Sequence, residues 1–212
     1  MHKIYKMELR EKILKHISEK FRRMGIKSIT MDSLASELGM SKRTLYEMFR
    51  QKDDLVLEAI RYMIVKENDE MLKIIEQSSH VVEALYFIMK GKKEMRETFS
   101  DSFQKDIKKY LPAIQESLFA DRQKLQKYSA SFVLLEKGKK AAIFRPEINI
   151  ELVDSFIQEM ITIIHSSPRI KAIKPNETEI LHHIFIPYFR GLCTGKGLEL
   201  MDKFFVEINE IK

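Results

Sequence analysis

Residues that end helices are scarce in this sequence and unevenly placed. The chain of 212 residues holds 7 Gly and 5 Pro, and neither type occurs between Met40 and Lys90. Near the N-terminus, apolar residues recur at a spacing of four, as in Leu9, Ile13 and Ile17. This period is typical of amphipathic helices. No segment alternates apolar and polar residues over a useful length, so we expect an all-α fold.

The helix breakers divide the chain into a series of predicted helices. Beyond the two short helices treated next, we expect helices at about 5–24, 53–77, 80–98, 101–109, 113–137, 149–166, 176–190 and 197–211. The joints in the C-terminal half are Pro112, Gly138, Pro146, Pro168 and Pro175. Because no Gly or Pro lies between Met40 and Lys90, the helix at 53–77 can leave the N-terminal region without a flexible linker.

Two short helices flank a single glycine turn at Gly39. Thr30 is a good N-cap for the first helix and Ser41 for the second. Two capped helices around one tight turn are a candidate helix-turn-helix. The residues expected to face inward are Leu34, Ala35, Leu38, Leu45 and Phe49.

The positive charge of the chain is concentrated in its first quarter. Residues 1–52 hold 13 Lys or Arg against 6 Asp or Glu, a net charge of +7. The remaining residues hold 24 against 25, a net charge of −1. The excess is either an ordinary solvated helix face or a surface for a polyanion, and its localisation favours the polyanion.

The second helix of such a motif enters the major groove of DNA with its N-terminal residues. Lys42, Arg43 and Thr44 are therefore candidates for contacts with base edges. Ser41, Tyr46 and Lys52 are candidates for phosphate contacts. The helix starts near Thr30 and Lys52 can add backbone N–H groups toward phosphate. The predicted DNA-binding residues are thus Thr30, Ser41, Lys42, Arg43, Thr44, Tyr46 and Lys52.

The same segment resembles the DNA-binding domain of the TetR family of bacterial transcriptional regulators. The spaced positions that match the family pattern are Thr30, Ala35, Gly39, Ser41, Leu45, Tyr46, Phe49, Lys52 and Leu55. Two positions depart from it: Met48 replaces a residue that often contacts phosphate, and Gln51 is a poor helix cap. The turn from Phe144 to Glu147 is a second, weaker likeness.

The resemblance implies a DNA-binding domain at 1–52 and a helical bundle for effector binding and dimerisation at 53–212. It further implies a repressor that binds a palindromic operator as a dimer and is released by a small-molecule effector. The sensor half is rich in methionine and aromatic residues, among them Met63, Phe103 and Tyr128. Most of these residues are expected to be core, so the effector-binding residues stay unknown.

The helices near 149–166 and 176–190 are candidates for a homodimer interface. The first carries apolar residues around too much of its circumference for one amphipathic stripe, and the second is nearly as apolar. Two such helices suit a four-helix interface between subunits, although burial within one subunit is the alternative. The family resemblance favours the interface.

Other chemistry finds little support in the sequence. The segment Gly191 to Gly197 is too short for a phosphate loop. The neighbours His182 and His183 face different directions, so we expect no metal site and no cofactor. Cys193 is either a redox sensor or, more commonly for a free cysteine, a small buried apolar residue.

The broad class that remains is a soluble, non-enzymatic regulator. No acid–base pair or activated nucleophile stands out, although an enzyme and a protein-binding scaffold are the alternatives. The N-terminus has no secretory signal, and the longest run without Asp, Glu, Lys or Arg, Ile180 to Phe189, is too short to cross a bilayer. The single cysteine fits a reducing compartment, so we expect a cytoplasmic protein without a membrane partner.

Overall fold

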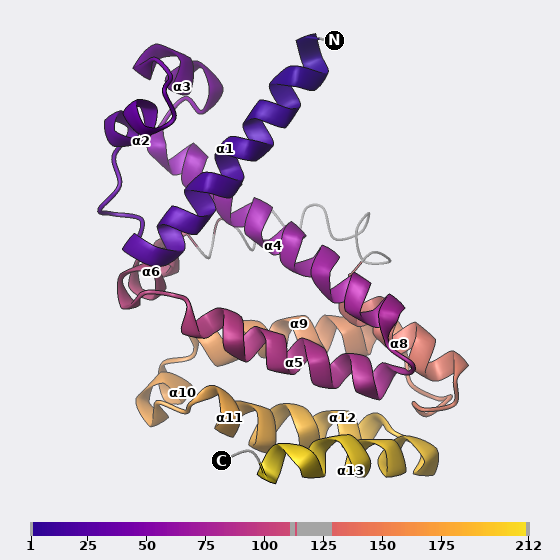
Figure 1. Ribbon diagram of the computed structural model, residues 1–212. Helices are drawn as coiled ribbons and strands as arrows, with labels where there is room; N and C mark the ends of the chain where they lie inside the picture. Colours follow the sequence, from indigo (N-terminus) through magenta and orange to yellow (C-terminus); the bar gives the residue numbers. More distant parts are fainter. Residues whose placement is uncertain (1, 111–112, 114–128, 211–212) are drawn as a thin grey trace. The chain divides into compact units, whose positions relative to one another are not determined.

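The computed structural model describes residues 2–110, 113 and 129–210, and it confirms the all-α fold class (Figure 1). The helices are α1 (His2–Met24), α2 (Met31–Glu37), α3 (Lys42–Met48), α4 (Lys52–Gln77), α5 (Val81–Glu97), α6 (Asp101–Asp106), η1 (Ile107–Lys109), α8 (Ala130–Lys140), α9 (Ile150–Ser166), α10 (Pro168–Ile173), α11 (Glu177–Ile180), η3 (Leu181–Phe185), α12 (Ile186–Leu192) and α13 (Gly195–Glu210). Within these described ranges, no strand forms and no helix is long and apolar enough to cross a membrane.

The chain packs into two compact units. The first unit comprises the described parts of residues 1–68 and 94–124, and the second those of 69–93 and 125–212. Both α4 and α5 run from one unit into the other. The predicted domain boundary between residues 52 and 53 falls inside the first unit, so it does not coincide with the boundary between the two units. It stays a prediction about which residues bind DNA.

The core of the first unit joins the helix-turn-helix to its neighbours. Ile17 and Phe21 of α1 are buried together with Leu55 of α4 and Phe103 of α6. Helices α2 and α3 contact each other and contribute the inward-facing residues of the motif. Of the residues predicted to face inward, four are buried and Leu38 is half-buried: the buried ones are Leu34, Ala35, Leu45 and Phe49. Met63 also belongs to this core.

The turn between α1 and α2 packs directly against α6. Gly25 has a φ of +82°, and a Cβ added there would lie 2.7 Å from the Cβ of Ser102. The buried carboxylate of Asp106 accepts hydrogen bonds from the backbone amides of Ile26 at 2.9 Å and Lys27 at 2.8 Å. Glycine is therefore needed at this turn both for its conformation and for the close approach of α6.

The predicted helix at 113–137 is wrong in the part that the structure describes, because Ser129 lies outside any helix and the C-terminal end lies beyond residue 137. Residues 114–128, including Tyr128, lie outside the described residues, and α8 begins only at Ala130, where Ser129 caps it. It then continues past Gly138, which is a buried helical residue and not a joint. A Cβ on Gly138 would lie 2.3 Å from the ring of Phe144, so glycine serves close packing here.

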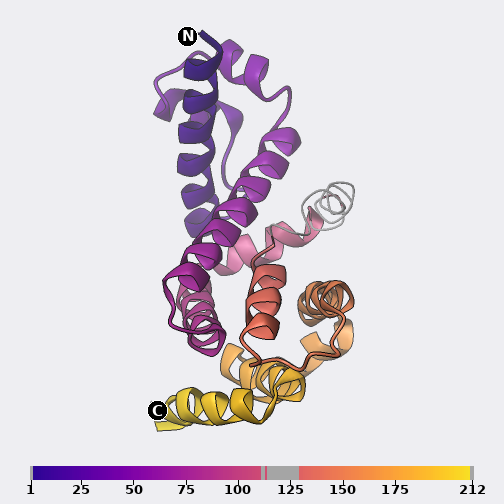
Figure 2. The same ribbon diagram turned by 90° about the vertical axis from the view of Figure 1, so that its right-hand side faces the viewer.

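The C-terminal part of the second unit is more segmented than predicted. A short helix, α10, begins at Pro168, and the predicted helix at 176–190 consists of α11, the π-helical turn η3 and α12. An isolated bridge pairs Phe144 with Cys193, and the amide of Arg145 donates to the carbonyl of Leu192 at 2.9 Å. Figures 1 and 2 both show α13 beside α12.

Candidate nucleic-acid interface

The start of α2 is fixed by a reciprocal cap. The hydroxyl of Thr30 accepts a hydrogen bond from the amide of Ser33 at 3.1 Å, and the amide of Thr30 donates to the hydroxyl of Ser33 at 3.1 Å. Together these bonds satisfy two donors that the first turn would leave open. Thr30 is thus confirmed as the N-cap, and its side chain stays exposed.

The start of α3 is held by Ser41. Its hydroxyl accepts from the amide of Thr44 at 3.0 Å and lies 2.8 Å from the Thr44 hydroxyl. Within this helix of seven residues Leu45 is buried, while Lys42, Arg43 and Thr44 are exposed. The cap therefore presents the predicted base-contacting residues to solvent on a single helical turn.

Both cations at the start of α3 have carboxylate partners. The ammonium of Lys42 lies 2.5 Å from a carboxylate oxygen of Asp32, which raises the pKa of Lys42 through this hydrogen bond. The guanidinium of Arg43 donates to Glu47 at 2.8 Å. All four side chains are largely exposed, and exposed pairs of this kind contribute little to stability. The cations are therefore available to another anion at small cost.

The Lys42–Asp32 pair also brings two parts of the predicted site together. Asp32 lies in the first turn of α2, so the pair places the capped start of α2 next to that of α3. Tyr46 is 42% exposed within α3. Lys52 is set apart, because it begins α4 after the turn that follows α3.

Lys52 is half-buried at the first turn of α4. Burial lowers the pKa of Lys52, while the carboxylates of Asp106 and Asp53 act in the opposite direction. Asp53 itself accepts hydrogen bonds from the hydroxyl of Tyr110 at 2.8 Å and the ammonium of Lys109 at 3.1 Å, and these bonds lower its pKa. The start of α4 is thus anchored to the segment that follows α6.

Sequence reasoning missed the acidic partners of the site. The pair of Arg43 and Glu47 could have been found, because residues four apart on a helix are neighbours. The pair of Lys42 and Asp32 joins two helices and leaves no such local signal. Arg50, an exposed cation between α3 and α4, was also passed over, although its charge and position make it a candidate for phosphate contact.

The other segments considered in the sequence have structural roles. The ammonium of Lys196 donates to the carbonyl of Ala141 at 3.0 Å, and Thr194 accepts from the amide of Gly197 at 3.2 Å. Burial raises the pKa of Cys193 to about 11, which keeps its thiol protonated and unreactive near neutral pH. Among the described residues, no cluster of three or more His, Cys, Asp or Glu could hold a metal ion.

Comparison with known proteins bears on the fold and on the N-terminal segment. No curated protein matches the sequence. A solved structure of the superantigen PfiT has a TM-score of 0.52 at 17% identity, covering 84% of this chain and 95% of that one, which supports the fold alone. The ketosteroid transcriptional regulator KstR2 of Mycobacterium tuberculosis matches with a TM-score of 0.47 at 19% identity, over 87% of this chain and 95% of that one.

The family comparison covers the helix-turn-helix itself. Residues 13–59 match the family described as bacterial regulatory proteins, tetR family. This range contains the whole of α2 and α3, the glycine turn between them, and the buried residues that hold them to α1 and α4. The segment that holds α2 and α3 is therefore similar to the DNA-binding region of bacterial regulatory proteins of the tetR family.

Proposed function

We propose that this protein is a transcriptional regulator of the tetR family, a repressor that binds a palindromic operator as a homodimer and leaves it when a small-molecule effector binds. The observation that carries the proposal is the capped, exposed first turn of α3, with Lys42, Arg43 and Thr44 side by side. A helix of this kind reads bases through the residues of its N-terminal turn. The basic excess of residues 1–52 adds the electrostatic attraction that any DNA-binding surface needs.

The contacts in this complex follow from the side chains. Arg43 and Lys42 exchange their carboxylate partners for O6 and N7 of guanine, and the methyl group of Thr44 contacts a thymine methyl. Ser41, Tyr46 and Lys52 bond to phosphates, as does the capped helix start at Thr30. These phosphate contacts set the register of the protein on the duplex, while the first three residues select the sequence.

The homodimer is proposed on the exposed apolar side of α9. Leu152, Phe156 and Ile163 are 68%, 51% and 52% exposed, although they lie in a well-formed helix. The ring of Phe156 lies 5.3 Å from that of Tyr188 in α12, so both predicted interface segments contribute to one apolar surface. Two copies joined there would present two copies of α3 about 34–36 Å apart to successive major grooves.

The effector is proposed to act through the part of the chain after residue 52. An effector can shift the regulator only through different affinities for its DNA-competent and DNA-incompetent conformations. Helix α4 begins at the DNA-contacting Lys52 and is continuous to Gln77, so it provides a covalent helical connection between the two units. The regulator works without a cofactor and without catalysis.

Selection of bound fragments from the source genome tests the proposal. The purified protein should enrich a fragment with an inverted repeat, and footprinting should show two protected half-sites. Arg43→Ala should then weaken operator binding by about 1–3 kcal/mol and relax specificity at one position of each half-site. Lys52→Ala should weaken binding to all sequences alike and reduce the salt dependence.

Arg23→Ala provides the matched control, because Arg23 is an exposed cation of α1 outside the proposed interface. It should change operator affinity less than Arg43→Ala does. The proposal fails if the protein enriches no fragment in low salt, or if Arg43→Ala loses operator and random DNA to the same extent.

A further inference from the structure

The recognition helix α3 ends differently from the two helices before it. Helices α1 and α2 are followed by glycines in the left-handed region, Gly25 and Gly39, which is the common way to end a helix. Helix α3 is followed by Phe49 with a φ of −134°, so it lacks such a cap. The carbonyl of Met48, its last residue, therefore needs a partner from elsewhere.

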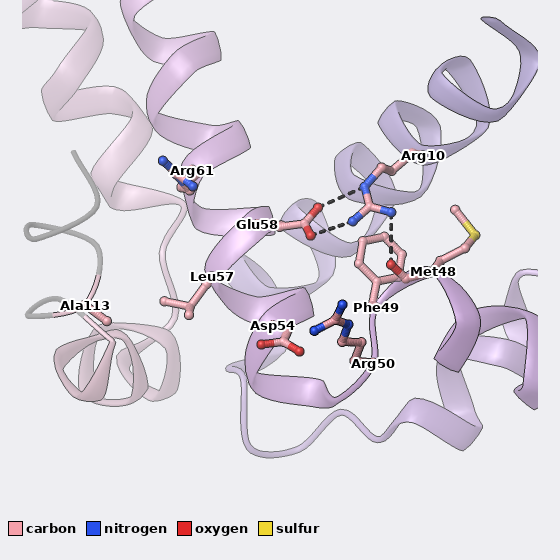
Figure 3. A pocket seen from close by; sticks show the side chains of 9 residues that line it. All are labelled: Arg10, Met48, Phe49, Arg50, Asp54, Leu57, Glu58, Arg61 and Ala113. Atoms are coloured by element: carbon pink, nitrogen blue, oxygen red, sulfur yellow. Dashed lines mark hydrogen bonds and ion pairs between the residues drawn. The ribbon is translucent and has the colours of Figure 1, made fainter. Parts of the chain in front are cut away.

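That partner is Arg10 of α1. Its Nη1 donates to the carbonyl of Met48 at 3.0 Å, and its guanidinium lies 4.4 Å from the centre of the Phe49 ring (Figure 3). A cation at this position also interacts favourably with the negative end of the helix dipole. Arg10 thus supplies to α3 what a glycine cap supplies to α1 and α2.

The same guanidinium is fixed on its other side by α4. Its Nε donates to Glu58 Oε2 at 2.9 Å, and its Nη2 donates to Glu58 Oε1 at 2.5 Å. This two-bond fork holds the plane of the guanidinium in one orientation. Through Arg10, the end of α3 is therefore tied to both α1 and α4, and each nitrogen of the guanidinium has a partner.

The other contacts that hold α3 are its buried side chains and the Lys42–Asp32 pair to α2. A helix of seven residues is too short to be stable alone. Within it Leu45 is buried, and Phe49 just beyond is buried as well, so the two buried anchors lie at its middle and just past its end. A small rotation about these anchors would displace Lys42 and Arg43 at the other end from the bases.

From this geometry we infer that Arg10 is a positioning residue for operator recognition, one that aims α3 without touching DNA. The inference rests on the proposed function, and it identifies the residue that holds α3 in its orientation for DNA binding. Arg10 acts through the Met48 carbonyl and the Phe49 ring, and Glu58 keeps it in place. Lysine cannot replace it, because an ammonium cannot form the fork and stack on the ring as well.

The surroundings of Arg10 make its substitution a fair test. The cluster borders an open pocket of about 430 Å³ that is also lined by Arg50, Leu57 and Arg61 (Figure 3). The side chains of Arg10 and Glu58 are 34% and 35% exposed, so their pairing contributes only modestly to global stability. A variant at this position should therefore fold.

The first arm of the experiment measures DNA binding of the full chain. Arg10→Met and Arg10→Lys should each weaken operator binding by about tenfold, as expected for the loss of a charged hydrogen-bond network. Random-DNA affinity and salt dependence of Arg10→Met should match those of Arg23→Met, which removes the same charge from an exposed site of α1, while those of Arg10→Lys should match the wild type. Glu58→Gln should weaken operator binding less, and combined with Arg10→Met it should add nothing further.

The second arm needs no DNA. Hydrogen exchange of the α3 amides in the free protein should be faster in Arg10→Met and Arg10→Lys than in Arg23→Met, while α1 exchange stays unchanged. If the wild type binds no operator, the proposed function fails, and this arm still decides whether Arg10 holds α3. A merely stabilising role would lower the melting temperature and leave the preference for operator over random DNA intact.

Three results would overturn the inference. Arg10→Lys could bind the operator as well as the wild type, which would make charge alone sufficient. Arg10→Met could lose operator and random DNA equally with a weaker salt dependence, which would make Arg10 a phosphate contact. Finally, α3 exchange could be the same in the Arg10 variants as in the wild type.

Discussion

The helices α3 and α9 expose opposite kinds of surface. In α3 the exposed residues are polar, and their charges are paired within the chain, as for Arg43 with Glu47. In α9 the exposed residues include large apolar side chains such as Leu152 and Phe156. Water solvates the first surface well, whereas it disfavours the second. The difference indicates that the surface of α3 suits reversible, salt-dependent contacts, whereas the surface of α9 suits a stable apolar interface.

The largest effect is expected from a charge on the apolar side of α9. Phe156→Glu should dissociate the proposed homodimer, at a cost of about 3 kcal/mol or more if Phe156 is central to the interface. Sedimentation equilibrium would measure the change. Phe87→Glu is the control, because Phe87 is an exposed phenylalanine of α5 in the second unit. If Phe156→Glu sediments as the wild type does, the contrast between the two surfaces has no bearing on assembly.

A smaller effect is expected where the second unit is tightly packed. Gly138→Ala should lower the free energy of unfolding by about 1–3 kcal/mol, because the added Cβ would meet the Phe144 ring at 2.3 Å. Gly191→Ala is the control, since a Cβ at Gly191 meets no heavy atom within 4 Å. Urea unfolding measures both. An unchanged midpoint for Gly138→Ala would mean that Phe144 can move away freely.

A pH-dependent effect on stability is expected from the buried carboxylate of Asp106 in α6. Burial alone would raise the pKa of Asp106, but the backbone amides of Lys27 and Ile26, together with the ammonium of Lys27, outweigh it and lower the pKa below its ordinary value of 3.8. A carboxyl group with a lowered folded-state pKa stabilises the fold above that ordinary value and loses this contribution as the pH falls through the lowered pKa.

Asp106→Asn should therefore destabilise the protein by about 1 kcal/mol at pH 7, and by less as the pH falls below about 4. Urea unfolding at pH 7 and below about pH 4 tests this prediction. Asp101→Asn, at an exposed carboxylate of the same helix, is the control. A loss for Asp106→Asn that is equal at both pH values would assign it to packing rather than to charge.

The smallest effect is expected on the surface of α3. Glu47→Gln frees Arg43 from its partner and removes a negative charge from the side of α3 that we propose faces DNA, so random-DNA affinity should rise by about twofold. Stability should change by no more than about 0.5 kcal/mol. Fluorescence anisotropy with a random duplex measures this, and Glu199→Gln at an exposed site of α13 is the control. Unchanged affinity would show that the pair does not restrain Arg43.

Features encoded by neighbouring residues were predicted well. The caps at Thr30 and Ser41 and the turn at Gly39 depend on side chains within three or four residues. The inward-facing residues of the helix-turn-helix follow from helical spacing for the same reason. Whether these exposed side chains bind DNA stays a prediction.

Features that depend on distant residues were missed. Gly138 looks like a joint in the sequence, and only the ring of Phe144 explains a glycine inside a helix. The carboxylate of Asp106 bonds to amides 79 and 80 residues away, and Arg10 bonds to Met48 and Glu58 at separations of 38 and 48. Contacts of this range leave no periodic trace from which they could be predicted.

The π-helical turn η3 accommodates one extra residue between α11 and α12. Ile180 and Phe189 are both buried, although nine residues of regular α-helix make about two and a half turns and would point them in opposite directions. The extra residue of a π-turn reduces this divergence. An alignment with a relative whose helix is regular therefore needs a one-residue gap within Leu181–Phe185. Without the gap, every position after it would be matched to a neighbour about 100° around the helix.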